Sequence, residues 1–381
     1  MARKPKPALA SASSKPHDPP RSSSLLVRLA VVACLLAALP ALGRELGWWG
    51  LRPALELLTT HTIEAALATH TLLHVGGPHR GGTTVLSDLL EAHPRVAGLA
   101  TPSGALGSRS AVGGGSKGPL NEGLFLQSVL PKFRLSTDPG ELVLRLLTGT
   151  LRKNGTGWGS YAFAADAHLT ERNETGLLTE QNRRKLMTEW ARHWPTLAPP
   201  RRVLLEKSPT NVMLWRLLDA LWSLSEPDGR DVRFLFIRRH PLAVALAQRS
   251  YLDASHLSVR QLVEHWLYQQ ESLARDLDER PDAAARVRRL RYEDLAADPA
   301  GTLAAIFEWL GVDDGAAAAR ASAVAVLRAV PFHGGKNQKK LAAFCKALAR
   351  DGCGVLALEP RVAAAGYSLR EWSDACGVQC A

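Results

Sequence analysis

Hydrophobic residues along the chain form short runs that alternate with longer segments of helical periodicity. The runs are residues 70–76, 202–205, 232–237 and 287–290. Apolar residues recur at helical spacing in the segments between and after them, which are 83–93, 122–130, 138–152, 177–194, 211–224, a segment that starts at 242, 258–279 and 295–310. Short buried strands that alternate with helices predict an α/β fold, a P-loop-like parallel sheet flanked by helices.

The N-terminal region has a different pattern. Residues 25–42 are almost entirely apolar and are interrupted only by Arg28 and Pro40, a length at the short end of a bilayer-spanning helix. Basic residues precede this segment, which predicts an N-terminus in the cytosol. A cleaved signal peptide and an organelle transit peptide are the alternatives. The expected organisation is a disordered cytosolic tail (1–24), a transmembrane signal anchor (25–43), a stem (44–69) and one luminal domain (70–381).

Two further patterns favour the secretory route. Four of the five cysteines lie near the C-terminus, at positions 345, 353, 376 and 380. This even set predicts two disulfides, with three possible connectivities, in an oxidising compartment. Four free thiols are the alternative, and the absence of a histidine at ligand spacing disfavours a zinc site. Asn154 and Asn173 each begin a glycosylation sequon, which is typical of a surface loop in a secreted protein.

The charge of the chain bounds the class of ligand. The net charge is +11, with 46% hydrophobic and 22% charged residues. Six basic residues and one acid fall in the first 28 positions, so the excess on the remaining domain is modest. Such an excess suits an anionic substrate or cofactor. We expect no nucleic-acid binding, because the chain has no zinc-finger spacing and no basic repeat with interleaved aromatic residues.

The segment 76–84, Gly-Gly-Pro-His-Arg-Gly-Gly-Thr-Thr, contains the strongest chemical signal. It lies between a predicted strand and a predicted helix, where glycines let backbone N–H groups surround an anion. Thr83 and Thr84 occupy the helix N-terminus, which attracts negative charge. The lysine that a nucleotide-triphosphate P-loop requires is replaced by Thr83, and the cation, Arg80, lies inside the loop instead. This arrangement predicts a phosphate or sulfonate site.

These residues resemble the 5′-phosphosulfate loop of sulfotransferases that use PAPS (3′-phosphoadenosine 5′-phosphosulfate). Arg80 to Thr84 fits the family pattern of a basic residue followed by x-Gly-Thr-Thr, with Gly81 where serine is usual. Residues 235–250 resemble the family's 3′-phosphate segment, in which a strand ends in arginine and a serine follows eight residues later. Residues 290–312 also match. The loop resembles that of Golgi and membrane-type members, related to tyrosylprotein and carbohydrate sulfotransferases, and also that of a broader group of plant, algal and bacterial members.

The resemblance implies a Golgi membrane enzyme that binds PAPS as co-substrate and needs no metal. The cofactor-binding residues that it implies are Arg80, Gly81, Gly82, Thr83, Thr84 and Arg239. The family's serine is replaced by Ala247, and we expect Gln248 or Ser250 to supply the missing polar group. Tyr292, Glu293 and Asp294 are expected to order the loop after a strand rather than to do chemistry.

The resemblance also implies the catalytic residues. Arg80 is expected to stabilise charge on the sulfonate and Lys207, assisted by Ser208, to act at the bridging oxygen. Glu122 is the predicted base and His79 the second candidate. The acidic stretch of tyrosylprotein sulfotransferases is absent, because residues 97–101 are Ala-Gly-Leu-Ala-Thr. We therefore expect a carbohydrate hydroxyl as acceptor, with a protein tyrosine as the alternative. A P-loop nucleotide kinase and an inactive sulfotransferase-like binding protein are the competing classes.

Overall fold

The computed structural model describes residues 63–64, 68–99, 122–130, 168–194, 202–224, 231–250, 257–312, 335–351 and 353–377. The expected tail and signal anchor, most of the stem, the helix at 138–152 and the sequon at Asn154 lie outside these ranges. Within them, no helix combines the length and the apolar character that a bilayer crossing requires.

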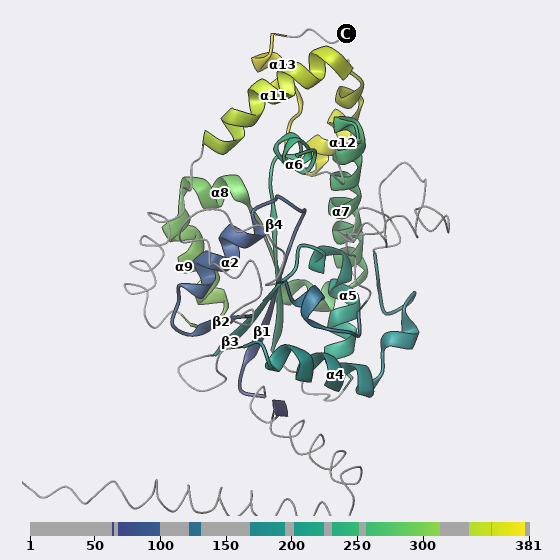
Figure 1. Ribbon diagram of the computed structural model, residues 1–381, viewed down its shortest axis with the longest axis vertical. Coiled ribbons are helices and arrows are strands. Elements are labelled where there is room, and N and C mark those ends of the chain that lie inside the picture. The colour runs from purple at the N-terminus through teal and green to yellow at the C-terminus, as the bar shows by residue number, and fades with distance from the viewer. Residues whose placement is uncertain are drawn as a thin grey trace, which may run out of the picture. The chain divides into compact units, whose positions relative to one another are not determined.

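The described residues from 71 onward form a three-layer α/β unit around one parallel sheet (Figure 1). Its strands are β1 (Thr71–Gly76), β2 (Val96–Gly98), β3 (Val203–Lys207), β4 (Val232–Arg238) and β5 (Val287–Arg291), in the order β2-β3-β1-β4-β5. All four strand pairs are parallel. Parallel neighbours require crossover connections, so every strand ends at the same edge of the sheet.

Helices cover both faces of the sheet and its carboxyl edge. The α-helices are α2 (Thr83–Glu91), α4 (Glu180–Ala191), α5 (Asn211–Trp222), α6 (Pro241–Gln248), α7 (Val259–Glu279), α8 (Tyr292–Ala297), α9 (Pro299–Trp309), α11 (Gly335–Asp351), α12 (Glu359–Ala364) and α13 (Arg370–Ala375). Short 3₁₀ segments are η1 (Gly123–Leu126), η3 (Thr175–Leu177), η5 (Pro281–Arg286) and η6 (Cys353–Leu358). In Figure 1, α2, α8 and α9 lie on one side of the sheet and α4, α5 and α7 on the other.

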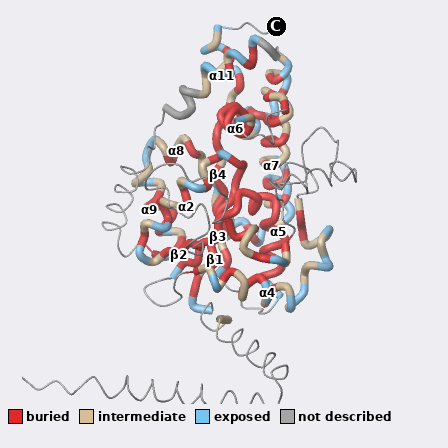
Figure 2. Tube along the Cα trace, viewed as in Figure 1, coloured by how far each residue is buried: buried red, intermediate tan, exposed pale blue. Residues whose placement is uncertain are grey.

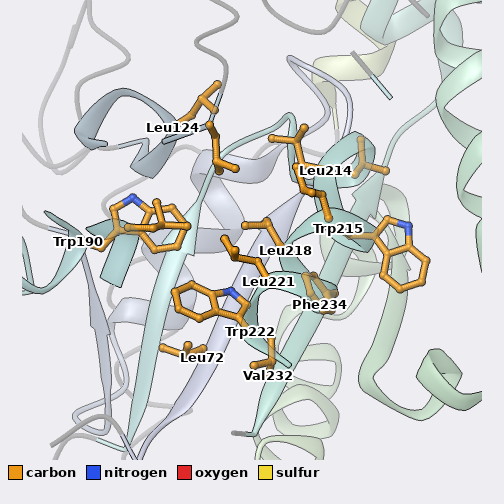
Figure 3. Close-up of a cluster of buried hydrophobic side chains, with 14 of the residues drawn as sticks. Leu72, Leu124, Trp190, Leu214, Trp215, Leu218, Leu221, Trp222, Val232 and Phe234 are labelled. Carbon is orange, nitrogen blue, oxygen red and sulfur yellow. The ribbon is translucent and has the colours of Figure 1, made fainter. Parts of the chain in front are cut away.

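Alternating side chains of the strands separate the core into two layers. Leu73 and Val75 of β1 pack with α2, α8 and α9, whereas Leu72 packs with α4 and α5. The strands β1 to β4 are mostly buried (Figure 2), as parallel strands usually are, whereas the edge strand β5 is only partly buried. On the α5 side the core is rich in aromatic residues, and Trp190 and Trp222 lie below Leu124 in Figure 3.

A third buried cluster surrounds α6 and joins it to α7, α11 and α12. α6 is buried along its whole length, and Pro241 starts it at a position where the missing N–H costs nothing. Ser258 and Gln261 cap α7 reciprocally. This cluster fixes the chain beyond the carboxyl end of β4.

The structure corrects three sequence expectations. The helix predicted at 122–130 is only one turn, η1, because Glu122 and Gln127 are extended at its two ends. The helix predicted at 295–310 is two helices, since Pro299 starts a new one and Asp298 caps it through the Gly301 N–H. The short strand β2 and the helix α11 were not predicted.

Candidate functional site

The predicted site residues gather at the carboxyl edge of the sheet, beside β1 and β3. Val75 of β1 is paired with Lys207 of β3, so Lys207 lies next to the start of the glycine-rich loop. α2 follows β1 on one face and α5 follows β3 on the other. Adjacent parallel strands whose helices leave to opposite faces form a crevice at their carboxyl ends, which is where ligands bind in open α/β sheets.

Close packing explains why glycines occupy the loop after β1. Gly77 has φ 147°, and a Cβ there would overlap the carbonyl oxygen of Ile237 on β4. Gly82 has φ 110°, and a Cβ there would lie 2.7 Å from the ring of Tyr292. Arg80 has φ 69° and is the only non-glycine residue with positive φ among the described positions. A non-glycine residue held in this region is strained, and such strain is frequent at functional sites.

Arg239 reaches back from the end of β4 to this loop. Its Nη1 donates a hydrogen bond to the carbonyl oxygen of Arg80 at 3.4 Å, and its guanidinium lies over the ring of Tyr292 at 4.6 Å. Burial lowers the pKa of Arg239, and the charge of Arg80 acts in the same direction. The structure thus brings together the two arginines that the sequence predicted to act at one site.

A third cation, which the sequence did not reveal, lies near enough to these two for their charges to affect it. Lys340 lies on α11, and burial together with the charges of Arg239 and Arg80 lowers its pKa. Cations that repel one another are stabilised when an anion binds among them. No helix was predicted at 335–351, and nothing in that segment indicated proximity to the loop.

The two predicted substitutes for the family's serine have different surroundings. Gln248 Nε2 donates to the carbonyl oxygen of His79 at 3.0 Å, so Gln248 contacts the loop. Its Oε1 is buried and has no partner among the described residues. Ser250 Oγ donates to the carbonyl oxygen of Ala247 at 2.6 Å and closes the end of α6. Gln248 is therefore better placed than Ser250 to meet a ligand in the loop.

The predicted base and the predicted catalytic lysine form a buried ion pair. Lys207 Nζ lies 3.1 Å from Glu122 Oε1, although 85 residues separate them in sequence. Both side chains are buried, with residue exposures of 3% and 7%. Ser208, which was expected to assist Lys207, donates instead to Glu206 and accepts from the Leu124 N–H. His79, the second candidate for the base, is buried in the loop.

Asp88 is a further carboxylate of this region that the sequence did not single out. It lies on α2, near enough to Lys207 for that charge to affect it. Burial raises the pKa of Asp88 to about 6, Glu91 raises it further and Lys207 opposes the shift. Its Oδ2 is buried and accepts no hydrogen bond from the described residues.

The residues after β5 order the loop after β4, as predicted. Glu293 accepts hydrogen bonds from the His240 N–H and from the Tyr367 hydroxyl, both at 2.9 Å. Tyr367, from the C-terminal region, thereby contacts the segment that carries Arg239. Burial raises the pKa of the Tyr367 hydroxyl.

Disulfides tie this C-terminal region together. Cys345 of α11 is bonded to Cys376 at the end of α13, which selects among the three connectivities. Cys353 is also in a disulfide, and its partner lies outside the described residues. One disulfide of the expected pair is therefore confirmed, and Cys380 lies outside the described residues.

Comparisons with solved structures find sulfotransferases. A sulfotransferase of Mycobacterium avium is 17% identical, with 74% of this chain and 77% of that chain covered and a TM-score of 0.37. One of Alicyclobacillus acidocaldarius is 17% identical, with 79% and 97% covered and a TM-score of 0.36. A retinol dehydratase, solved with androsterone and inactive cofactor PAP, is 17% identical, with 72% and 69% covered and a TM-score of 0.34. No curated protein matches significantly.

A family model gives the decisive comparison. The model described as "Sulfotransferase family" matches residues 122–315, which is just over half of the chain. The match begins at Glu122 and includes Lys207 and Arg239, although the glycine-rich loop precedes it. This chain belongs to the sulfotransferase family.

Proposed function

We propose that the protein transfers the sulfuryl group of PAPS to a hydroxyl of a carbohydrate in the secretory lumen. The observation that carries the proposal is the contact between Arg239 and the loop residue Arg80, together with the buried pair of Glu122 and Lys207 at the same edge of the sheet. The first set can hold two anionic groups of one nucleotide. The second set can exchange a proton and stabilise charge where the group is transferred.

The loop fits the phosphosulfate end of this donor. α2 has no acidic residue in its first turn, and it starts at Thr83 after a glycine in the left-handed conformation. Its first N–H groups can therefore bind an anion without a competing carboxylate in the first turn of the helix. Arg239 and Lys340 supply further positive charge for a second phosphate group.

The buried ion pair gives the chain's residues distinct roles. Glu122 Oε1 receives the proton of the acceptor hydroxyl as the acceptor oxygen bonds to sulfur. Lys207, 3.1 Å from that carboxylate, stabilises the oxygen from which the sulfuryl group departs. The products are the sulfate ester, adenosine 3′,5′-bisphosphate (PAP) and the proton held by Glu122. PAPS supplies the activated sulfuryl group, so the protein need only bind, orient and exchange this proton.

The disulfide between Cys345 and Cys376 supports the proposed compartment. Such bonds persist in the secretory pathway and are rare in the reducing cytosol. A Golgi location and the anchor at 25–43 remain proposals, since that segment lies outside the described residues. The carbohydrate acceptor rests on the missing acidic stretch at 97–101.

Radiolabelled PAPS, offered with a panel of glycans and tyrosine peptides, tests the activity of the purified luminal domain. Transfer to a glycan is expected, and transfer to tyrosine alone would reassign the acceptor. Glu122→Gln is expected to lower kcat about 100-fold or more while PAP affinity stays within about twofold. Full activity of this variant with an intact fold would remove Glu122 as the base.

Calorimetric measurement of PAP binding tests the proposed nucleotide site formed by Arg80 and Arg239. Arg239→Ala is expected to weaken PAP binding at least about 30-fold, because a charged hydrogen bond contributes about 2 kcal/mol or more. Arg233→Ala is the matched control, since Arg233 lies on β4, the strand that precedes Arg239, and pairs with Asp231. Tight binding of ATP with magnesium in place of PAP would favour a kinase. PAP binding without transfer to any acceptor would favour an inactive binding protein.

A further inference from the structure

A buried carboxylate, Glu206, contacts the segment that follows Glu122. Glu206 is 1% exposed and occupies the residue before Lys207 on β3. Its Oε1 accepts from the Gly123 N–H at 3.1 Å and from Ser208 Oγ at 2.6 Å. Its Oε2 accepts from Asn211 Nδ2 at 2.6 Å and lies 3.1 Å from His74 Nδ1.

The tautomer of His74 completes this set of donors. Trp222 Nε1 lies 3.1 Å from His74 Nε2, and an indole N–H can only donate. His74 Nε2 is therefore the acceptor, and the ring proton is on Nδ1, which donates to Glu206. The imidazole stacks on Phe234, with ring centroids 5.3 Å apart. Four donors, from β1, from the residue after β3, from α5 and from the η1 segment, thus converge on one carboxylate.

The same network holds the backbone on both sides of Gly123. Its N–H donates to Glu206, and its carbonyl oxygen accepts from Trp190 Nε1 at 2.8 Å. The next N–H, of Leu124, donates to Ser208 Oγ at 3.0 Å. A Cβ at position 123 would overlap Cγ of Glu206, so only glycine allows this approach. The η1 segment is one turn long and has no side-chain cap, so these bonds fix its position.

Glu122 immediately precedes this fixed peptide. Its φ and ψ of −92° and 123° are extended, and its side chain meets Lys207, the residue after Glu206. Because side chains alternate along a strand, β3 presents Lys207 to one face and Glu206 to the other. Two adjacent residues of β3 therefore hold Glu122 in place. Lys207 contacts its side chain, and Glu206 accepts a hydrogen bond from the N–H of the next residue, Gly123.

We infer that Glu206, with Ser208 as its partner, is a positioning residue. It holds the backbone beside Glu122 so that the Glu122–Lys207 pair is correctly oriented for sulfuryl transfer. The inference rests on the proposed function, in which Glu122 is the base. Glu206 itself does not contact the reacting atoms, because its two oxygens are occupied by the four donors. Small displacements of a catalytic group lower the rate strongly, so the network controls kcat rather than nucleotide affinity.

A double-mutant cycle tests this inference. Glu206→Gln keeps the shape but places an amide NH₂ where two donors point, and it is expected to lower kcat about 10- to 100-fold. PAP affinity is expected to stay within about twofold. In the Glu122→Gln background the same change should cost less than about threefold, because a residue that acts through Glu122 has no further effect once the base is gone. Equal losses in both backgrounds would overturn the inference.

A milder pair of variants covers the case in which Glu206→Gln fails to fold. Gly123→Ala keeps every polar group but forces the peptide away from Glu206, and Ser208→Ala removes only the hydroxyl. Both are expected to lower kcat at least about tenfold, and unchanged kcat in both would refute the inference. Asp219→Asn is the control, since Asp219 is an equally buried carboxylate on α5 that pairs with Arg280 and Arg286. It should lower stability and leave kcat unchanged.

Hydrogen exchange separates this inference from the proposed function. The peptide that spans 122–126 is expected to exchange at least about tenfold faster in Gly123→Ala and Ser208→Ala than in the wild-type protein. Unchanged exchange would show that the network does not position the segment. If the wild-type protein neither binds PAP nor transfers sulfate, the proposed function fails, while the exchange measurement still decides whether the network holds Glu122.

Discussion

Replacing Arg80 by glycine or by alanine removes the same guanidinium, but the two replacement residues differ in how readily their backbone adopts a positive φ. Arg80 has φ 69°, and the other positive-φ residues that the structure describes are glycines. Alanine keeps the Cβ that makes this conformation unfavourable, whereas glycine adopts it readily. The two variants therefore separate the contribution of the backbone from that of the charge.

The expected difference in stability follows from two opposing contributions. The left-handed conformation costs a non-glycine residue about 1–2 kcal/mol. The extra freedom of glycine in the unfolded chain costs about 0.5–1 kcal/mol. Arg80→Gly should therefore be more stable than Arg80→Ala by about 0.5–1 kcal/mol, which corresponds to a Tm difference of about 2 °C for a domain of this size.

Urea unfolding and calorimetric PAP binding measure the two contributions on the same samples. Both variants should bind PAP at least about 30-fold more weakly than the wild-type protein, and equally so, because both lack the guanidinium. A glycine variant no more stable than the alanine variant would refute the argument from strain. Retained PAP affinity in both variants would instead show that Arg80 is not part of the nucleotide site.

The remaining predictions concern three other positions. Gly77→Ala is expected to destabilise the fold by about 3 kcal/mol or more, measured by urea unfolding, because its φ is 147° and its Cβ would overlap the carbonyl oxygen of Ile237. Lys340→Ala is expected to weaken PAP binding about tenfold by calorimetry, with Lys340→Arg close to wild type. Asp88 has a folded pKa of about 6, above the usual 3.8, so its protonated form stabilises the fold at low pH and this stabilisation is lost as pH rises through about 6. Asp88→Asn should therefore gain about 1–2 kcal/mol of stability over the wild-type protein between pH 4 and pH 7.5, measured by urea unfolding at several pH values.

Much of the sheet was predictable because β1, β3 and β4 are largely apolar. β1, β3, β4 and β5 were all expected within about two residues of their observed bounds. β2 was missed because it has only three residues, Val96 to Gly98, at the start of a stretch rich in glycine and serine. The pairing of β1 with both β3 and β4 followed from no local pattern, since it depends on contacts between segments more than 100 residues apart.

The site was predictable where a residue type alone carries its chemistry. Glycines, threonines and arginines at strand ends indicated an anion site, and the structure brings Arg80 and Arg239 together. The role of Glu206 was not predictable, because a glutamate before a lysine at a strand end is usually exposed. Its burial depends on donors from His74 and Gly123, which only the folded sheet places beside it.

The C-terminal region extends the site in a way that its sequence did not indicate. His240, next to Arg239, stacks on Trp372 with ring centroids 4.4 Å apart, and its Nε2 lies 3.0 Å from the carbonyl oxygen of Ser368. α11 carries both Lys340 and Cys345, and the disulfide from Cys345 joins it to the end of the helix that carries Trp372. The residues that hold the β4 loop and the helix that brings the third cation are therefore one covalently linked unit. In this chain, the residues beside Arg239 are thus held by a C-terminal segment that lies beyond the range 122–315 that matches the family model.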